Sequence, residues 1–155
     1  MNNQYKKRRS WVRRAFFNYK NNKVRLVKLK RDYDSCEIPS VGGGNGCGTS
    51  GSHENGAEKS VIHYLAERER LERAVKSCEW QIALVDKTLE HFAVEELLKG
   101  MPHKRYIECR FLRGMSYRRA AVEFEVAEST AGYWMEEIYN TAEMIAEIEG
   151  YLKRA

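Results

Sequence analysis

The stretch GMSYRRAAVEFEVAESTAGYWMEEI, residues 114–138, decides the fold, because it holds two apolar-periodic runs with a helix-start signal before each. Ser116 precedes the first run, and Glu128-Ser129-Thr130 opens the second. Side-chain oxygens at Ser116, and at Ser129 or its neighbours, can accept hydrogen bonds from the unpaired N–H groups of a helix start. Residues 125–127 leave room only for a tight turn. The pattern predicts a helix-turn-helix, a unit whose second helix enters the major groove of DNA. The expected inward residues are Tyr117, Ala120, Ala121 and Phe124 in the first helix and Ala131, Trp134, Met135 and Ile138 in the second.

Hydrophobic periodicity predicts further helices around this unit. Residues 11–34 are expected to form an amphipathic basic helix that weakens near Asn21-Asn22, and residues 57–92 the longest helix. Glu, Arg and Lys flank the apolar seam of the longest helix as in a coiled coil, and only Arg68 interrupts it. Pro102 is expected to begin a short helix that Gly114 ends. No strand pattern occurs, so the predicted fold class is all-α. The apolar seam of the longest helix consists of Tyr64, Leu71, Val75, Cys78, Ile82, Val85, Leu89 and Phe92. The last helix is expected to run from Ser129 to about Leu152. Its own apolar stripe continues through Ala142, Ile145, Ile148 and Leu152.

These helices divide the chain into four predicted parts. They are a basic helical arm (1–34), a flexible Gly/Ser linker (35–56), a coiled-coil-like helix (57–100) and a helix-turn-helix domain (101–155). A phosphate-binding loop in the glycine-rich part would need Gly-Lys-Ser/Thr between a strand and a helix, and neither feature is present. The linker is long enough for the long helix to fold back antiparallel against residues 11–34. The same apolar stripe could instead pair with another subunit.

The charge is distributed unevenly along the chain. The formal net charge is +5, yet residues 1–31 hold twelve Lys or Arg and no acid, which leaves 15 basic residues against all 22 acidic residues in the remainder. Basic charge confined to one arm indicates a polyanionic partner, most simply nucleic acid. No apolar run approaches the length of a membrane span, and no apolar stretch follows the basic N-terminus as in a signal peptide.

The cysteines and histidines nominate no metal or catalytic site. Cys36, Cys47, Cys78 and Cys109 show no CxxC spacing, which favours reduced thiols in a cytoplasmic protein. A zinc site from Cys36, Cys47, His53 and His63 fits no common ligand spacing. The four histidines lie far apart without a nucleophile or paired carboxylate at an interpretable spacing. We therefore expect a protein that is not an enzyme and needs no cofactor.

The helix-turn-helix resembles region 4 of sigma factors. Gly114-Met115-Ser116 opens its first helix, Ala120-Ala121 supplies the small residues in the middle, and Ser129-Thr130-Ala131 opens its second helix. The lead-in Arg110-Phe111-Leu112-Arg113 matches the arginine and aromatic pattern of those domains. The whole layout, with Phe17-Asn18-Tyr19-Lys20 in its first helix, resembles phage transcriptional regulators of the ArpU/RinA type. That resemblance implies a phage or prophage protein of Gram-positive bacteria that is associated with control of late genes.

The residues expected to bind DNA fall into three groups. The arm would follow the phosphate backbone or enter a minor groove, or would be only a solubilising tail. Segment 102–119, which also holds Lys104 and Arg105, would flank the groove. The start of the second helix would read bases. The groups are Lys6, Lys7, Arg8, Arg9, Arg13 and Arg14; Arg110, Arg113, Arg118 and Arg119; and Glu128, Ser129, Thr130, Gly132 and Tyr133.

The second helix is acidic where sigma-like relatives are often basic. Glu128 could accept a hydrogen bond from cytosine, Tyr133 could touch a thymine methyl group or the backbone, and Gly132 would allow a close approach to DNA. Ser129 and Thr130 would be adaptable donors. Alternatively this helix contacts protein. We expect Trp134 to lie in the core, and Glu136 and Glu137 to form a solvated face.

Three functions remain open at this point. The first is a sequence-specific, non-enzymatic regulator of phage transcription that binds double-stranded DNA, either as an oligomer through residues 57–92 or together with RNA polymerase. The second is a packaging component similar to a small terminase subunit. The third is a sigma-like adaptor that docks on RNA polymerase without touching DNA.

Overall fold

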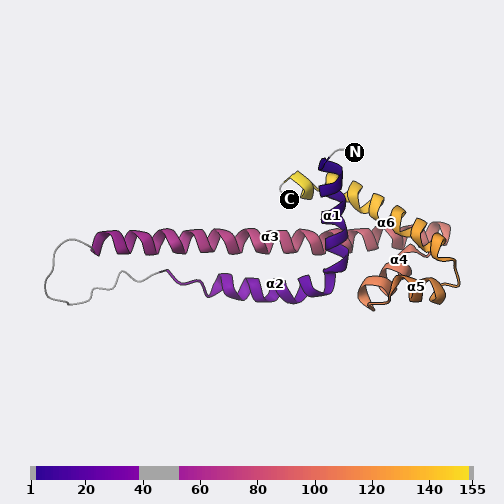
Figure 1. The fold of residues 1–155 in the computed structure, drawn as a ribbon, viewed down its shortest axis with the longest axis horizontal. Coiled ribbons are helices and arrows are strands. Elements are labelled where there is room, and N and C mark those ends of the chain that lie inside the picture. Colours follow the sequence, from indigo (N-terminus) through magenta and orange to yellow (C-terminus); the bar gives the residue numbers. More distant parts are fainter. Residues whose placement is uncertain (1–2, 39–52, 154–155) are drawn as a thin grey trace.

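The computed structural model describes residues 3–38 and 53–153, and this part of the chain folds into helices without any strand (Figure 1). The expected all-α class is therefore confirmed. A long hairpin occupies one end of the molecule and a body of shorter helices the other (Figure 1). The elements are α1 (Asn3–Phe17), α2 (Tyr19–Asp34), α3 (His53–Lys99), α4 (His103–Ile107), η1 (Glu108–Leu112), α5 (Tyr117–Glu123), α6 (Glu128–Ile148) and η2 (Tyr151–Lys153).

The hairpin consists of α2 running antiparallel to the first part of α3 (Figure 1). The 47 residues of α3 make a rod about 70 Å long at the usual helical rise. Leu29, Leu71 and Cys78 are the buried centre of the hairpin, and Leu26, Tyr33 and Val75 pack around them. The apolar seam of the long helix is thus covered within the same chain, by the fold-back arrangement.

Arg68 has a defined role in this hairpin. Its guanidinium donates hydrogen bonds to the Tyr64 hydroxyl at 2.7 Å and to the Tyr33 hydroxyl at 3.2 Å. The same group lies 4.7 Å from the centre of the Tyr33 ring. Arg68, the charged residue that interrupts the apolar seam, therefore joins α2 to α3 through polar contacts.

The expected single helix over residues 11–34 is wrong, because the chain bends at Asn18 and forms two helices. Asn18 leaves the helical conformation at φ −97° and ψ 5°. α1 buries Phe16 in the body, whereas α2 buries Leu29 in the hairpin, and one straight helix cannot reach both cores. Asn22, expected to weaken the helix, is buried and donates to Gln81 Oε1 at 2.8 Å. It strengthens the hairpin instead.

The body packs α1, α4, η1, α5 and α6 around the C-terminal part of α3. Phe16, Leu84, Tyr106, Ile107 and Ile138 are fully buried in its core. As expected, a helix follows Pro102 and stops before Gly114, whose φ of +71° suits glycine. Its second half widens to a π-helix, in which the Arg113 N–H donates to the Glu108 carbonyl at 2.9 Å.

The end of α6 differs from the expected stripe to Leu152. Gly150, at φ +74°, ends the helical region after Ile148, and residues 151–153 form a short 3-10 turn. Ile148 is consequently 78% exposed. Tyr151 is buried instead and stacks on Trp80 with ring centres 6.2 Å apart.

Most of the predicted linker 35–56 lies outside the described residues, and with it Cys47 and the glycine-rich loop. His53–Gly56 belong to α3 rather than to the linker.

Cys36, Cys78 and Cys109 are free thiols, and the last two are buried as expected from their apolar positions. Burial raises the pKa of the Cys78 thiol, which donates to the Asn22 carbonyl at 3.1 Å.

Candidate nucleic-acid interface

Helices α5 and α6 are joined by residues 124–127, with capping at the first helix only. Ser116 Oγ accepts the N–H of Arg119 at 3.2 Å, as expected of a helix start. The residue before α6 is Ala127, which offers no side-chain cap. The expected cap at Ser129 is therefore wrong, because Ser129 already lies in the first turn of the helix. Glu125 makes the turn at φ +53°, a left-handed conformation that is uncommon outside glycine.

Gly132 allows a close approach inside the protein. The Tyr117 hydroxyl, which donates to the Glu128 carbonyl, lies 2.9 Å from the place where a Cβ on residue 132 would be. Any larger residue would push Tyr117 away and disturb its bond to the start of α6. The space at Gly132 that we expected DNA to use is thus occupied by Tyr117.

The inward face of α6 matches the expected one. Ala131, Met135 and Ile138 are buried, and Trp134 packs edge-on against Phe124 and Tyr106 with ring centres 5.8 and 5.6 Å away. Ser129 is exposed, Tyr133 is 73% exposed and Thr130 is half-buried. The first two turns of α6 therefore present a small polar surface with one aromatic ring.

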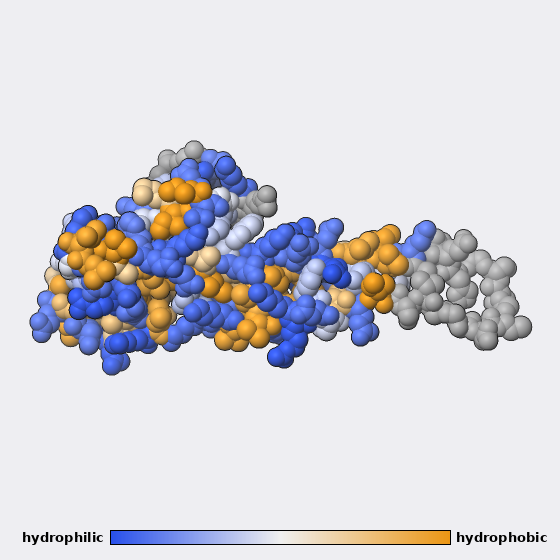
Figure 2. Space-filling view, turned by 180° about the vertical axis from the view of Figure 1, so that it is seen from behind, coloured by the Kyte–Doolittle hydropathy of each residue, from blue (hydrophilic) through white to orange (hydrophobic). Residues whose placement is uncertain are grey.

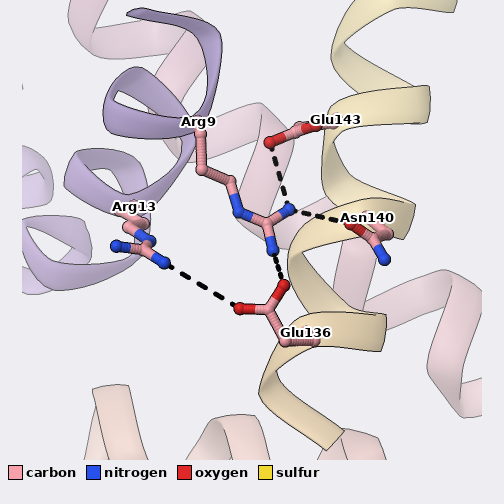
Figure 3. Close-up of polar contacts among 5 residues, drawn as sticks. All are labelled: Arg9, Arg13, Glu136, Asn140 and Glu143. Atoms are coloured by element: carbon pink, nitrogen blue, oxygen red, sulfur yellow. Dashed lines mark hydrogen bonds and ion pairs between the residues drawn. The ribbon is translucent and has the colours of Figure 1, made fainter. Parts of the chain in front are cut away.

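The acidic residues in the middle of α6, Glu136 and Glu137, are exposed as expected, and both also bind residues of other helices. The Glu136 carboxylate pairs with Arg9, and with Arg13 at 3.9 Å (Figure 3). Glu137 binds Nε2 of His103 at 2.5 Å. His103 is fully buried and stacks on Phe92 with ring centres 5.0 Å apart. The expected exposure of these glutamates is therefore confirmed, and each also makes a tertiary contact that the sequence did not predict.

Arg9 is the centre of this network and lies only 7% exposed. Figure 3 shows its guanidinium reaching from α1 to α6, where it also donates to Asn140 at 2.9 Å and to Glu143 at 3.1 Å. It lies 5.1 Å from the centre of the Tyr139 ring. Burial raises the pKa of Tyr139, and nearby arginines oppose that rise. Arg9 is buried and bound to residues of α6, so we withdraw it as a DNA contact.

Arg110 is also held by the protein. Its Nη1 donates to the Met115 carbonyl at 2.7 Å, and its Nε is buried. It therefore supports the loop before α5, and we withdraw it as a DNA contact too. Lys104 and Arg105 pair with Glu108 at 3.9 Å and Glu96 at 2.7 Å.

The other cations that were predicted to bind DNA are exposed, and they lie in two groups. Arg113, Arg118 and Arg119 surround α5, where Arg118 is 85% exposed and pairs loosely with Glu128 at 3.5 Å. Lys6, Lys7 and Arg14 lie on the outer side of α1 and form no ion pair within residues 3–38 and 53–153. Arg8 pairs with Glu147 at 3.9 Å and Arg13 with Glu136, and both stay about half exposed.

The chain has no significant match among protein-family models, curated proteins or solved structures. Within the described ranges no helix is long and apolar enough to cross a membrane. The same ranges contain no group of three His, Cys, Asp or Glu side chains placed to share a metal ion.

Sequence reasoning missed His103 as the partner of Glu137. The sequence shows only that His103 follows Pro102 at a helix start, and this position does not indicate which residue His103 contacts.

Proposed function

We propose that this chain binds double-stranded DNA through α5 and the start of α6, and regulates phage late genes without catalysing a reaction. The observation that carries the proposal is the surface at the start of α6. There Ser129 and Tyr133 are exposed at the tip of a long helix, and the exposed Arg118 of α5 lies beside that tip, 3.5 Å from Glu128; Arg119 of α5 is exposed too. Duplex DNA offers a groove for such a helix tip and phosphates for the flanking arginines.

The acidity of α6 is compatible with this role, because arginines within the protein offset two of its carboxylates. Glu128 faces Arg118, and Glu136 faces Arg9 and Arg13. Free glutamates would repel DNA, but paired carboxylates impose a much smaller penalty. The adaptor hypothesis depended mainly on this acidity, so the pairing weakens its main support.

The roles divide by position. Arg113 and Arg119 would hold phosphates beside the groove, since each is exposed and neither has an ion-pair partner within the described residues. Ser129, Thr130 and Tyr133 would face base edges. Arg118 would exchange its loose contact with Glu128 for a phosphate, which would release Glu128 to accept from cytosine.

The test begins with selection of bound sequences from a random pool of DNA duplexes. Affinity for a selected duplex is then measured across a salt series for the wild-type chain and for R113A/R119A. Loss of two phosphate contacts should reduce the salt slope by about 2 and weaken binding on the order of ten- to a hundredfold at 0.1 M salt. The matched control is K59A/R73A, which removes two exposed cations of α3 and should change nothing. Absence of any selected sequence, or equal behaviour of the two double variants, overturns the proposal.

A packaging role is the second candidate, and the tip of the hairpin favours it. Ile62 is 65% and Leu65 is 52% exposed there, close to the apolar surface that Figure 2 shows near the end of the hairpin. Subunits of a ring would cover such a surface. The mass of the protein in solution separates the two functions, since a closed ring of many copies supports packaging and a monomer or dimer supports regulation.

A further inference from the structure

Helix α1 has two sides with different tasks. Its inner side buries Trp11, Val12, Ala15 and Phe16 against the body. Arg9 fixes its rotation through the bonds to α6. Its outer side carries Lys6, Ser10 and Arg14, which follow one another every four residues and therefore lie in one row. This row is held in place by the inner side, unlike the flexible tail that a basic N-terminus often makes.

Helix α1, which carries this row, packs on the stripe of α6 that begins at the proposed reading end. Ser129, Glu136, Asn140, Glu143 and Glu147 are spaced by seven, four, three and four residues, which places them on one stripe of the helix. Arg8 and Arg9 of α1 bind the last four of these residues. Helix α1 therefore covers the continuation of the stripe that begins at Ser129. Figure 1 shows α1 crossing the molecule with its N-terminus close to the C-terminal part of α6.

A hollow beside this row is lined by cations. Lys6, Lys7, Arg8 and Arg14 surround it, Gln4 and Ser10 add polar groups, and Leu152 closes one side. None of its described lining residues is acidic. By contrast, the hollow on the other side of the row, toward α6, includes Glu136. The hollow offers several N–H and O–H donors to an anion, and the nearby Glu147, which pairs with Arg8 at 3.9 Å, is not among its described lining residues.

We propose that this hollow on α1 binds backbone phosphates of the same duplex that receives the start of α6. The inference rests on the proposed function and adds a second anchor to it. Ser129 and Glu147 are about 27 Å apart along α6, so the anchor would contact the duplex at a place separate from the one that the reading residues contact. The protein would then contact DNA on one flank of its recognition sequence.

The chemistry of the hollow favours duplex phosphates over single-stranded nucleic acid. Trp11 is the one aromatic side chain among its described lining residues, and Trp11 is only 7% exposed. Proteins that hold single strands stack bases on exposed aromatic rings. A buried ring cannot do so, whereas lysine, arginine and serine suffice for a phosphate backbone.

The test uses a selected duplex with long flanks, a version with each flank removed in turn, and three double variants. For K6A/R14A we expect a salt slope reduced by about 2 and binding weaker by on the order of ten- to a hundredfold at 0.1 M salt. Removing one particular flank should weaken wild-type binding, and K6A/R14A should be insensitive to that flank. R113A/R119A tests the reading end, and K59A/R73A is the control. All substituted side chains are exposed, and circular dichroism checks that each variant folds.

Each result decides between the two proposals. If the wild-type chain binds no duplex, both fall. If R113A/R119A weakens binding while K6A/R14A behaves as the control, the second anchor falls and the proposed function stands. If K6A/R14A loses binding of inorganic tripolyphosphate but keeps full duplex affinity, the hollow is a site for free oligophosphates and the proposed anchor is overturned.

Discussion

The hairpin and the body of this protein are built from the same kinds of residues but are stabilised to different extents. The centre of the hairpin is a thin layer in which Leu29, Leu71 and Cys78 are buried. The body surrounds fully buried Phe16, Tyr106 and Ile138 with a continuous aromatic and aliphatic core. The stability that a core provides increases with the apolar surface that it buries. The body should therefore be more stable than the hairpin. The proposed reading surface and the cationic hollow both lie on the body, where a rigid support is needed.

The largest effect should come from removing Phe16. Phe16 contacts Phe111 and Tyr139 with ring centres 5.3 and 5.8 Å away, so it joins α1 to η1 and α6. We expect Phe16→Ala to lower the free energy of unfolding by about 3–5 kcal/mol, measured by urea denaturation. A loss below about 1 kcal/mol would show that α1 is not part of the core.

Leu71→Ala should have a smaller and local effect. The substitution removes the middle of the hairpin core and should cost about 2–3 kcal/mol. Native-state hydrogen exchange is the suitable measurement, because it reports opening of each region separately. Amides of α2 should exchange faster while those of α6 remain protected. Equal acceleration in both helices would mean that the hairpin and the body unfold as one unit.

Arg9→Ala and Arg14→Ala compare the two sides of α1. Arg9→Ala leaves Glu136 and Glu143 without their main cation and should cost about 1–3 kcal/mol, less than a fully buried pair because Glu136 is half exposed. Arg14→Ala should change stability by less than about 0.5 kcal/mol. Urea denaturation of both variants is the measurement. If Arg14→Ala is the more damaging, the roles of the two sides are reversed.

The smallest effect concerns Cys78, and it depends on pH. Burial raises the pKa of this thiol, so the folded state keeps its proton when the unfolded state has lost it. The stabilisation is present below the ordinary thiol pKa and falls as pH rises above it. Iodoacetamide should therefore modify the half-buried Cys36 well before Cys78 at pH 8–9, a range near the ordinary thiol pKa of about 8.5, as peptide mass mapping would show. Equal rates would mean that the hairpin opens readily.

Periodicity predicted the parts of the fold that depend on local pattern. The inward face of α6, with Ala131, Met135 and Ile138, and most of the seam of α3 follow from the spacing of apolar residues. The Ser116 cap follows from residue type at a helix start. Each of these features depends on neighbours within a turn or two of helix, and such information is present in the sequence itself.

Features set by distant partners could not be predicted in this way. Arg9 and Arg14 look alike in a basic arm, yet only Arg9 meets Glu136, Asn140 and Glu143. The bend at Asn18 arises because two separate cores capture α1 and α2. For the candidate site, the sequence predicted which residues of the start of α6 and which cations of α5 would be exposed, and DNA binding there stays a prediction. Arg9, Arg110 and Gly132 were assigned to DNA because the spacing of residues does not reveal their contacts within the protein, which for Arg9 lie more than 120 residues away in the sequence.

The central claim is that the start of α6 lies against duplex DNA. The most direct measurement places photo-cross-linking benzoylphenylalanine at Tyr133, which is 73% exposed, and in a control protein at the exposed Leu65 of the hairpin. Both proteins are irradiated with a duplex selected for binding. The account predicts a covalent DNA adduct at Tyr133 and none at Leu65. Duplex binding without an adduct at Tyr133, or equal adducts at both positions, would contradict it.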